Sequence, residues 1–258
     1  MLQRRVIPTL LLQGDALVKT KQFQSPTYIG DPCNTVEIFN ELEVDELVFL
    51  DISPHRHKVG PNFKLLEKIS SECFMPLAYG GGISNVEQAE KLFKIGFEKV
   101  IINTAGVNDP HLFIELAEKF GSQAVVAAVD FRLNKKGICE LYIQSGQKNT
   151  HKDVFEWCAE VEKLGVGEIL LTSIDREGMW TGLDIDLVRR VSAMLAIPVI
   201  AHGGVGSLED VYSLLSETDA SAVGVGSYFV FQKQGLGVLV NMPTHTEIQT
   251  MLKKITQQ

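Results

Sequence analysis

Glycine-rich segments that follow apolar strands are the residues of this chain with the clearest potential for chemistry. Glycine lets backbone N–H groups approach a phosphate, and the N-terminus of a following helix adds a favourable dipole. Each half of the chain has one such segment, with small polar residues one predicted strand later. The pattern predicts two phosphate sites, and so a substrate with a phosphate at each end; the alternative is that the glycines only make tight turns. The candidate ligands are Gly80, Gly81, Gly82, Asn103 and Thr104 in the first half, and Gly203, Gly204, Gly226 and Ser227 in the second.

A carboxylate at the end of one apolar segment has no counterpart in the other half. Segment 124–130 ends in Asp130, whereas segment 6–12 is apolar to its end, with Leu11 at the matching position. A carboxyl group can transfer a proton and a leucine side chain cannot. The asymmetry therefore bears on any reaction that needs a pair of such groups, although Asp130 could also be a turn or cap carboxylate.

Short apolar segments rich in β-branched residues alternate with amphipathic helices along the whole chain. Because these segments are nearly all apolar, they fit parallel strands buried on both faces. Eight such units in 258 residues predict an α/β fold, a (β/α)8 TIM barrel. A doubly wound open sheet is the alternative, but the first strand is not followed by the glycine-rich loop typical of that fold. The predicted strands are 6–12, 46–52, 76–79, 99–103, 124–130, 168–174, 198–202 and 221–227.

Capping residues mark several helix starts. Asp31 and Asp109 each precede a proline, which predicts an N-cap residue followed by a first-turn proline. The segment 84–87 predicts a capping box, and the segment 207–210 predicts a similar one. These signals place helices after the predicted strands.

The two halves of the chain repeat each other. The segment 76–85 matches the segment 198–207, an offset of 122 residues (198 minus 76). Self-similarity at this distance predicts a duplicated half-barrel, with strands 1 to 4 repeated as strands 5 to 8. No linker or low-complexity stretch separates the halves, so we expect residues 1–258 to form a single domain.

The composition limits the classes of partner. Lys and Arg number 24 and Asp and Glu number 32, so the formal net charge is −8, which argues against nucleic acid or an anionic membrane. Phosphorylated substrates are still allowed, because backbone N–H groups can bind phosphate on an acidic protein. The apolar segments are far shorter than the ~20 residues that span a bilayer, and no signal peptide is expected. The four cysteines show no C-x-x-C spacing, which predicts reduced thiols in a cytoplasmic protein. We expect neither a metal ion nor a cofactor.

Seven motifs carry a resemblance to a known family: 30–32, 45–52, 79–83, 102–105, 120–123, 167–176 and 203–206. With them the chain resembles the cyclase subunit of imidazole glycerol phosphate synthase over essentially its full length. The resemblance implies a (β/α)8 barrel that pairs with a glutaminase subunit and receives ammonia through the barrel. It also implies a bisphosphorylated ribulosyl carboxamide nucleotide as substrate, which is converted into imidazole glycerol phosphate and aminoimidazole carboxamide ribotide in histidine biosynthesis.

The family closes the bottom of its barrel with a ring of two basic and two acidic residues that gates ammonia. Charges that point into a barrel end need partners, so we expect the four to pair with one another. Four unrelated, solvated charges before strands are the alternative. The ring residues that the resemblance implies are Arg5, Glu46, Lys99 and Glu168.

At the opposite mouth the family uses two aspartates, at the ends of strands 1 and 5, as general acid and general base. Asp130 matches the second aspartate, and Leu11 replaces the first. Loss of general acid–base catalysis typically costs ~10²–10⁴-fold in rate. Further residues at active-site positions of the family are Lys19 and Asp51 as catalytic groups, and Ser173, Glu177 and Gly178 in substrate binding.

Two further departures from the family occur at the mouth. Glu177 stands where the family usually has aspartate, and His202 where it usually has a small residue. His202 could be an introduced acid–base group, or a spacer that reshapes the pocket.

An intact ring beside a broken acid–base pair favours a paralogue that keeps the ammonia conduit and changes the acceptor. Relatives of this kind, in clusters for bacterial surface-polysaccharide or lipopolysaccharide biosynthesis, imply a separate ATP-dependent sugar amidotransferase as a further partner. One alternative is a histidine-pathway cyclase with an altered acid. Another is a non-catalytic scaffold that docks and activates a glutaminase. The phosphoribosyl isomerase of the same pathway is disfavoured, because it does not need the charged ring.

Overall fold

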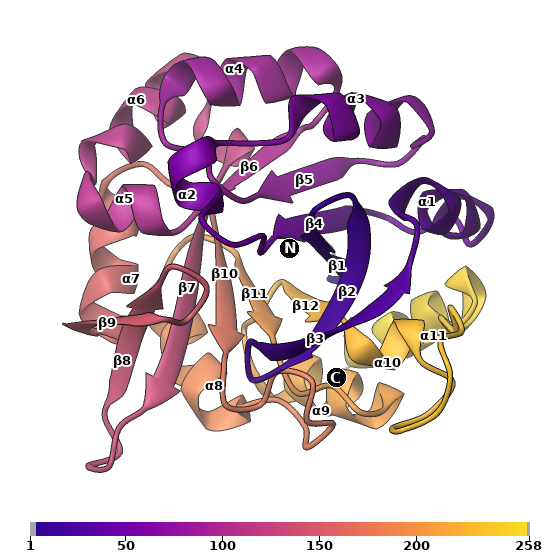
Figure 1. The fold of residues 1–258 in the computed structure, drawn as a ribbon. Coiled ribbons are helices and arrows are strands. Elements are labelled where there is room, and N and C mark those ends of the chain that lie inside the picture. The colour runs from indigo at the N-terminus through magenta and orange to yellow at the C-terminus, as the bar shows by residue number, and fades with distance from the viewer. Residues whose placement is uncertain (1–3, 257–258) are drawn as a thin grey trace.

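The computed structural model describes residues 4–256 and contains the predicted (β/α)8 barrel. Eight parallel strands form a closed sheet in the order β1, β4, β5, β6, β7, β10, β11, β12 (Figure 1), and the pairings of β7 with β10 and of β12 with β1 complete the circle. Each of the eight predicted strands coincides with one of these, to within a few residues at its ends. The barrel strands are β1 Arg5–Gln13, β4 Leu47–Asp51, β5 Leu77–Gly80, β6 Lys99–Ile102, β7 Val125–Leu133, β10 Glu168–Ser173, β11 Val199–His202 and β12 Ala222–Val225.

Two antiparallel hairpins extend the sheet beyond the predicted strands. After β1 comes the hairpin of β2 (Ala16–Lys21) and β3 (Gln24–Gly30), and after β7 comes that of β8 (Cys139–Ile143) and β9 (Lys148–Asp153). The second hairpin begins 123 residues after the first (139 minus 16). This distance is close to the offset of the sequence repeat. The duplication is therefore visible in the fold as well, and both hairpins lie in the foreground of Figure 1.

Helices surround the barrel (Figure 1) and pack their apolar faces on the outer side of the strands. The short helices α2, α5 and α10 lie in the loops that follow β4, β6 and β12. The helices are α1 Pro32–Glu41, α2 Arg56–Val59, α3 Phe63–Ser71, α4 Val86–Ile95, α5 Thr104–Asn108, α6 His111–Phe120, α7 Val154–Lys163, α8 Ile185–Met194, α9 Leu208–Glu217, α10 Ser227–Val230 and α11 His245–Thr256, with a 3-10 turn η1 at Ser122–Ala124.

Two of the predicted helix caps are confirmed. The Asp31 side chain accepts from the backbone N–H groups of Cys33 and Asn34 at the start of α1. At the start of α9, Ser207 and Asp210 form the predicted capping box.

The capping box predicted at 84–87 is wrong by one residue. The N-cap of α4 is Asn85, which accepts from the backbone N–H of Gln88, so the predicted box at 84–87 is not formed. Asn85 is the residue that corresponds to Ser207 at the offset of 122 (207 minus 85). In α6 the N-cap position itself is Pro110, but Asp109 Oδ1 accepts from the His111 backbone N–H at 3.2 Å, so the predicted aspartate does cap the first turn.

The strands bury both of their faces, which explains their nearly continuous apolar sequences. On β1, Val6 and Leu10 belong to the core between barrel and helices, whereas Ile7 belongs to the core inside the barrel. Nine buried side chains form this inner core: Ile7, Val48, Ala78, Ile101, Val126, Ala128, Leu170, Ile200 and Ala222.

Within residues 4–256, no helix combines the length and the apolar character that crossing a membrane requires. In the same range, no three His, Cys, Asp or Glu side chains gather in a way that could hold a metal ion. All four cysteines are free thiols.

Candidate active site

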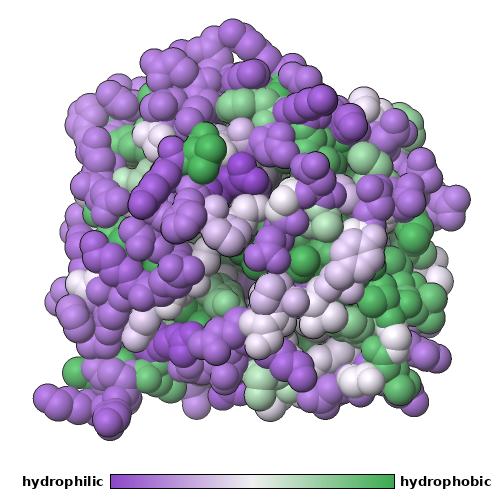
Figure 2. Space-filling model, viewed as in Figure 1, coloured by the Kyte–Doolittle hydropathy of each residue, from purple (hydrophilic) through white to green (hydrophobic). Residues whose placement is uncertain are grey.

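A cavity of about 510 Å³ opens where the barrel strands end. Barrel enzymes build their active sites at this end of the strands. Side chains of the inner barrel core, including Ile101, Ala128 and Leu170, line its bottom. In Figure 2 the hollow lies near the centre of the face, with hydrophobic residues in its depth. The titratable side chains in its wall are Asp51, His55, Arg56, His57, Asp109, Asp130, Glu177 and His202.

Asp130 lies on β7 and points into this cavity. The Asn103 amide donates to its Oδ2 at 3.0 Å. Burial raises the pKa of Asp130 to about 7, and a hydrogen bond from Thr172 acts in the opposite direction. A carboxyl group with a pKa near neutrality can both give and take a proton, which is the property that acid–base catalysis needs.

Leu11 of β1 lines the same cavity, with only 4% of its surface exposed. The match by position at the strand ends therefore paired the right residues, because both side chains line the mouth. The end of β1 presents an aliphatic group where β7 presents a carboxyl group.

Lys19 and Glu177 are buried polar residues beside the mouth. Lys19 is on β2, and its Nζ donates to the Thr9 carbonyl at 2.5 Å. Burial lowers the pKa of Lys19 to about 8, although the nearby Glu177 carboxylate favours its charged form. The opposite charges of Lys19 and Glu177 attract each other, which offsets part of the cost of burying them.

The Glu177 carboxylate is held by the first hairpin. Its Oε2 accepts from the Thr20 hydroxyl at 2.8 Å and from the Phe23 backbone N–H at 3.3 Å. Burial raises the pKa of Glu177, against the opposing effect of these hydrogen bonds and of Lys19. Of the residues predicted for substrate binding after β10, Glu177 is the one that lines the cavity.

His202 of β11 lies in the cavity wall and is buried. Its Nδ1 is 3.3 Å from the Thr172 hydroxyl. Burial and the charge of Lys19 lower the pKa of His202 to about 3. The imidazole is therefore neutral at physiological pH, so it does not act as a cationic proton donor.

Asp51, at the end of β4, is already engaged as an acceptor. Its Oδ2 pairs with Arg56 Nε at 2.8 Å, and its Oδ1 accepts from the Ser53 backbone N–H at 2.9 Å. The Tyr79 hydroxyl donates to Oδ2 at 3.4 Å. Asp51 lines the cavity, where it fixes the loop that leads into α2.

The first set of candidate phosphate ligands lies in the cavity wall. Gly81 and Gly82 have φ angles of 135° and 71°, which an L-residue adopts only with strain. The Asn103 amide also donates to the carbonyls of Ala128 and Tyr142, and Thr104 Oγ1 accepts from the Gln144 backbone N–H at 3.0 Å. The hairpin of β8 and β9 thus holds the polar groups of this side of the mouth.

The second set lies at the same end of the barrel but outside this cavity. The loop that follows β10 packs over it: the Gly204 carbonyl accepts from the Gly182 N–H at 2.9 Å, and Gly203 and Gly204 are buried. Gly226 leaves room for Lys19, because a Cβ there would lie 2.7 Å from its Nζ. None of the four residues of the second set lines the cavity, and neither do the predicted substrate-binding residues Ser173 and Gly178.

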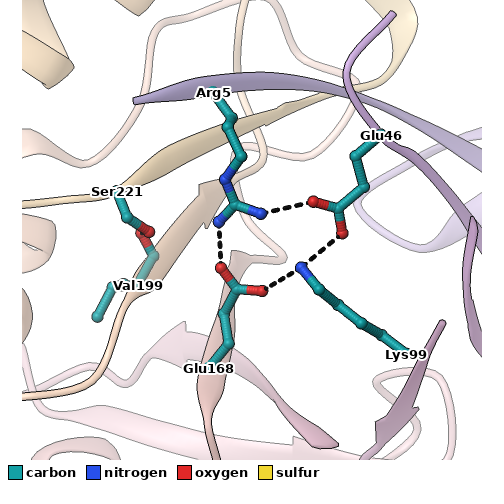
Figure 3. A network of polar contacts seen from close by, with 6 residues as sticks. All are labelled: Arg5, Glu46, Lys99, Glu168, Val199 and Ser221. Carbon is teal, nitrogen blue, oxygen red and sulfur yellow. Dashed lines mark hydrogen bonds and ion pairs between the residues drawn. The ribbon is translucent and has the colours of Figure 1, made fainter. Parts of the chain in front are cut away.

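At the opposite end of the barrel, four charged side chains form a closed ring of ion pairs (Figure 3). Arg5 contacts Glu46 at 2.5 Å and also Glu168, and Lys99 contacts Glu46 at 2.8 Å and Glu168 at 2.9 Å. Both carboxylates are buried, and the two cations are about one-fifth exposed. The four charges pair with one another and close the barrel floor; their role as a gate stays a prediction.

Comparison with known proteins places this geometry in a family. A family model described as "Histidine biosynthesis protein" matches residues 5–234. The imidazole glycerol phosphate synthase subunit HisF of Dehalococcoides mccartyi is 42% identical over 92% of this chain and 93% of its own length. The chain belongs to the HisF-type family.

Other HisF-type relatives are provisionally named. A protein of Pseudomonas aeruginosa, provisionally named imidazole glycerol phosphate synthase subunit HisF2, is 46% identical over 94% of this chain and 97% of its own length. A Leptospira borgpetersenii protein, provisionally named subunit HisF, is 41% identical over 97% of this chain and 99% of its own length.

Several residues of this HisF-type mouth were not found from the sequence. Thr172 lies beside both Asp130 and His202, and its position two residues from Leu170 on β10 is the signal that places it inside the barrel. Thr20 holds Glu177, but no sequence pattern connects them. Arg56 belongs to a run of basic residues, and such a run is a signal that the sequence alone contains.

Proposed function

We propose that this chain is the ammonia-accepting barrel subunit of a glutamine-dependent complex of the imidazole glycerol phosphate synthase type. The family reaction joins a ribulosyl carboxamide nucleotide and ammonia to form imidazole glycerol phosphate and aminoimidazole carboxamide ribotide. The observation that supports the proposal is that the two ends of the barrel differ: a closed ring of charges lies at the floor, and a cavity with polar side chains lies at the mouth. A glutaminase subunit would dock at the floor and a bisphosphorylated substrate at the mouth.

The barrel interior supports a path for ammonia between these ends. Three of its side chains, Ala78, Ala128 and Ala222, are alanines, and the others are apolar as well. A neutral ammonia molecule loses much less solvation energy in such an interior than an ammonium ion does. Ammonia released at the floor would then reach Asp130 without passing through bulk water, provided that the ring opens.

The finer part of the proposal concerns the acceptor. Leu11 removes one proton-transfer group of the family, and the neutral His202 does not supply a cationic one. We therefore favour a paralogue that delivers glutaminase-derived ammonia to sugar amidination in surface-polysaccharide biosynthesis. A separate ATP-dependent sugar amidotransferase would then use the ammonia, and cyclase activity would be weak.

A genuine histidine-pathway cyclase with an altered acid is the second candidate. It is favoured by Glu177, a buried carboxyl group in the wall of the cavity that also contains Leu11. A scaffold that only docks and activates a glutaminase accounts for neither the cavity nor the raised pKa of Asp130.

The decisive experiment bypasses the glutaminase. With the ribulosyl substrate and saturating ammonium, we expect imidazole glycerol phosphate formation at least about 10²-fold slower than for an active HisF, because one acid–base group is missing. Turnover equal to that of an active HisF would overturn the paralogue assignment and leave the cyclase. The glutaminase is then co-expressed: a one-to-one complex with raised glutamine hydrolysis supports the amidotransferase assignment, and failure to form any complex contradicts it.

A further inference from the structure

A run of basic side chains lies on the rim of the cavity, in and just before helix α2. His55, Arg56 and His57 line the cavity, and Lys58 beside them is exposed. No Asp or Glu occurs from position 52 to position 66, in a chain whose net charge is −8. The surface over α2, to the upper left of the hollow in Figure 2, is mainly hydrophilic.

The contacts of the Arg56 side chain hold the backbone of this segment in place. Its Nε pairs with Asp51 at 2.8 Å, its Nη1 donates to the Gly60 carbonyl at 3.1 Å and its Nη2 donates to Ser53 Oγ at 3.2 Å. The charge of Arg56 is thus balanced within the protein. The side chains left to meet a ligand are those of His55, His57 and Lys58, on a backbone that is held in place.

The backbone conformation at His55 supports a role in binding. His55 has φ 61° and ψ 14°, a left-handed conformation that non-glycine residues seldom adopt, and its side chain makes no capping hydrogen bond to α2. Strained backbone of this kind concentrates at functional sites. The ring centroids of His55 and His57 are 6.4 Å apart, close enough for both rings to donate to one anionic group between them.

The basic segment packs directly on the first glycine loop. A Cβ at Gly82 would lie 2.5 Å from the Arg56 carbonyl oxygen, so the two backbones are in contact. An anion bound at Gly82 would therefore have His55 and His57 as neighbours. The carboxylates in the cavity wall on this side are Asp51, which Arg56 neutralises, and Asp109. Asp15 lies beside the segment but outside the cavity wall, and its Oδ1 accepts from the Asn62 amide at 3.0 Å.

We propose that His55, His57 and Lys58 form an anion subsite that extends the site at Gly81 and Gly82. The mouth would then accept two adjacent phosphate groups, as in the phosphoanhydride of a nucleoside diphosphate. This subsite would be additional to the phosphate site predicted at the second glycine set, which lies outside the cavity beneath the loop after β10. This proposal rests on the proposed function in one respect, namely that the ligand binds at the mouth of the barrel.

The test compares inorganic pyrophosphate with inorganic phosphate by isothermal titration calorimetry of the whole chain. We expect wild type to bind pyrophosphate at least about tenfold tighter, because the second phosphate gains charge-assisted hydrogen bonds. The variant His55→Asn/His57→Ala/Lys58→Ala should lose most of this preference and keep its affinity for phosphate. Asparagine is chosen at position 55 because it tolerates the left-handed conformation.

A matched control separates a built site from general attraction to positive charge. Lys135 and Lys136 are exposed in the turn between β7 and β8, and Lys135→Ala/Lys136→Ala should leave the preference for pyrophosphate unchanged. The proposal is overturned if wild type binds both anions equally or not at all, or if the control loses as much as the triple variant. Thermal unfolding checks that each variant is folded. The assay needs neither ammonia nor a glutaminase, so its outcome is independent of whether the amidotransferase assignment holds.

Discussion

Leu11 of β1 and Asp130 of β7 line the same cavity at the barrel mouth, at the ends of the first strands of the two half-barrels. One is an aliphatic side chain, and the other is a carboxyl group whose pKa burial raises to about 7. At this level of the barrel, β7 supplies a titratable carboxyl group and β1 supplies none. The other titratable strand residues in the cavity wall are Asp51, which pairs with Arg56, and His202, whose pKa is lowered to about 3.

The first prediction restores the second carboxyl. Leu11→Asp should raise imidazole glycerol phosphate formation from ammonium by about 10²-fold, since lost acid–base catalysis typically costs that much. Leu11→Asn is the matched control, because it has nearly the same shape and cannot transfer the proton. Steady-state rates with saturating ammonium decide the matter. Equal rates for the aspartate and asparagine variants would show that position 11 is not what limits cyclase activity.

The second prediction follows from the raised pKa of Asp130. A carboxyl group whose pKa is about 7 when folded, against 3.8 as the ordinary value, binds its proton more tightly in the native state. It therefore destabilises the fold as pH rises from about 4 to about 7, and the full effect persists above pH 7. Between pH 5 and pH 8, wild type should lose about 2 kcal/mol more unfolding free energy than Asp130→Asn. Urea unfolding of both proteins at the two pH values measures this, and parallel losses would contradict the assignment.

The barrel strands could be predicted because strands buried on both faces have nearly continuous apolar sequences. The centre of a segment such as 168–174 is apolar on both faces, and eight such segments that alternate with helices favour a barrel. The hairpins could not be predicted in this way. β9, Lys148–Asp153, is polar along its whole length and is stabilised by pairing with β8 rather than by its own composition.

The site residues were predictable to the extent that they lie on barrel strands. Leu11 and Asp130 could be matched because strand position fixes which side chains point inward. The contacts of Asn103 with the Tyr142 carbonyl and of Glu177 with Thr20 depend on where the hairpins fold back, which local sequence does not determine. The path of the loop after β10, which packs over Gly204, is likewise not determined by local sequence, and the second phosphate site stays a prediction.

The third prediction concerns the loop that covers the second glycine set. Trp180 of this loop packs edge-on against Tyr228 of α10 at a centroid distance of 5.9 Å, and the Gly182 N–H is bonded to Gly204. In crystals soaked in sulfate, an anion should bind near Gly82 at lower concentration than near Gly204. Trp180→Ala should raise the occupancy of the second site and leave the first unchanged, which serves as the internal control. Ordered loops without an anion at either place would remove the support for both phosphate sites.

The fourth prediction concerns the stability of the charged ring. Lys99→Ala leaves Glu46 and Glu168 buried with Arg5 as their shared partner, and breaking a buried ion pair typically costs ~3–5 kcal/mol. Because Lys99 is about one-fifth exposed, we expect a smaller loss of unfolding free energy, about 2–3 kcal/mol. Lys94→Ala, which breaks the exposed pair with Glu90, is the control and should cost below about 0.5 kcal/mol. Urea unfolding gives both values.

The fifth prediction uses two variants of the ring, Lys99→Ala and Arg5→Ala, to test it as a gate for ammonia. In the complex with the glutaminase, Lys99→Ala and Arg5→Ala should alter the fraction of glutamine-derived nitrogen that reaches the product, because the floor of the barrel is then permanently open or misaligned. Glutamine labelled with ¹⁵N at its amide, supplied with unlabelled ammonium in the medium, measures that fraction by mass spectrometry. Turnover with ammonium alone should stay unchanged, since ammonium in the medium can enter at the mouth. If both variants transfer the label as wild type does, the four charges only stabilise the barrel floor, and the gate assignment is withdrawn while the ion pairs retain their structural role.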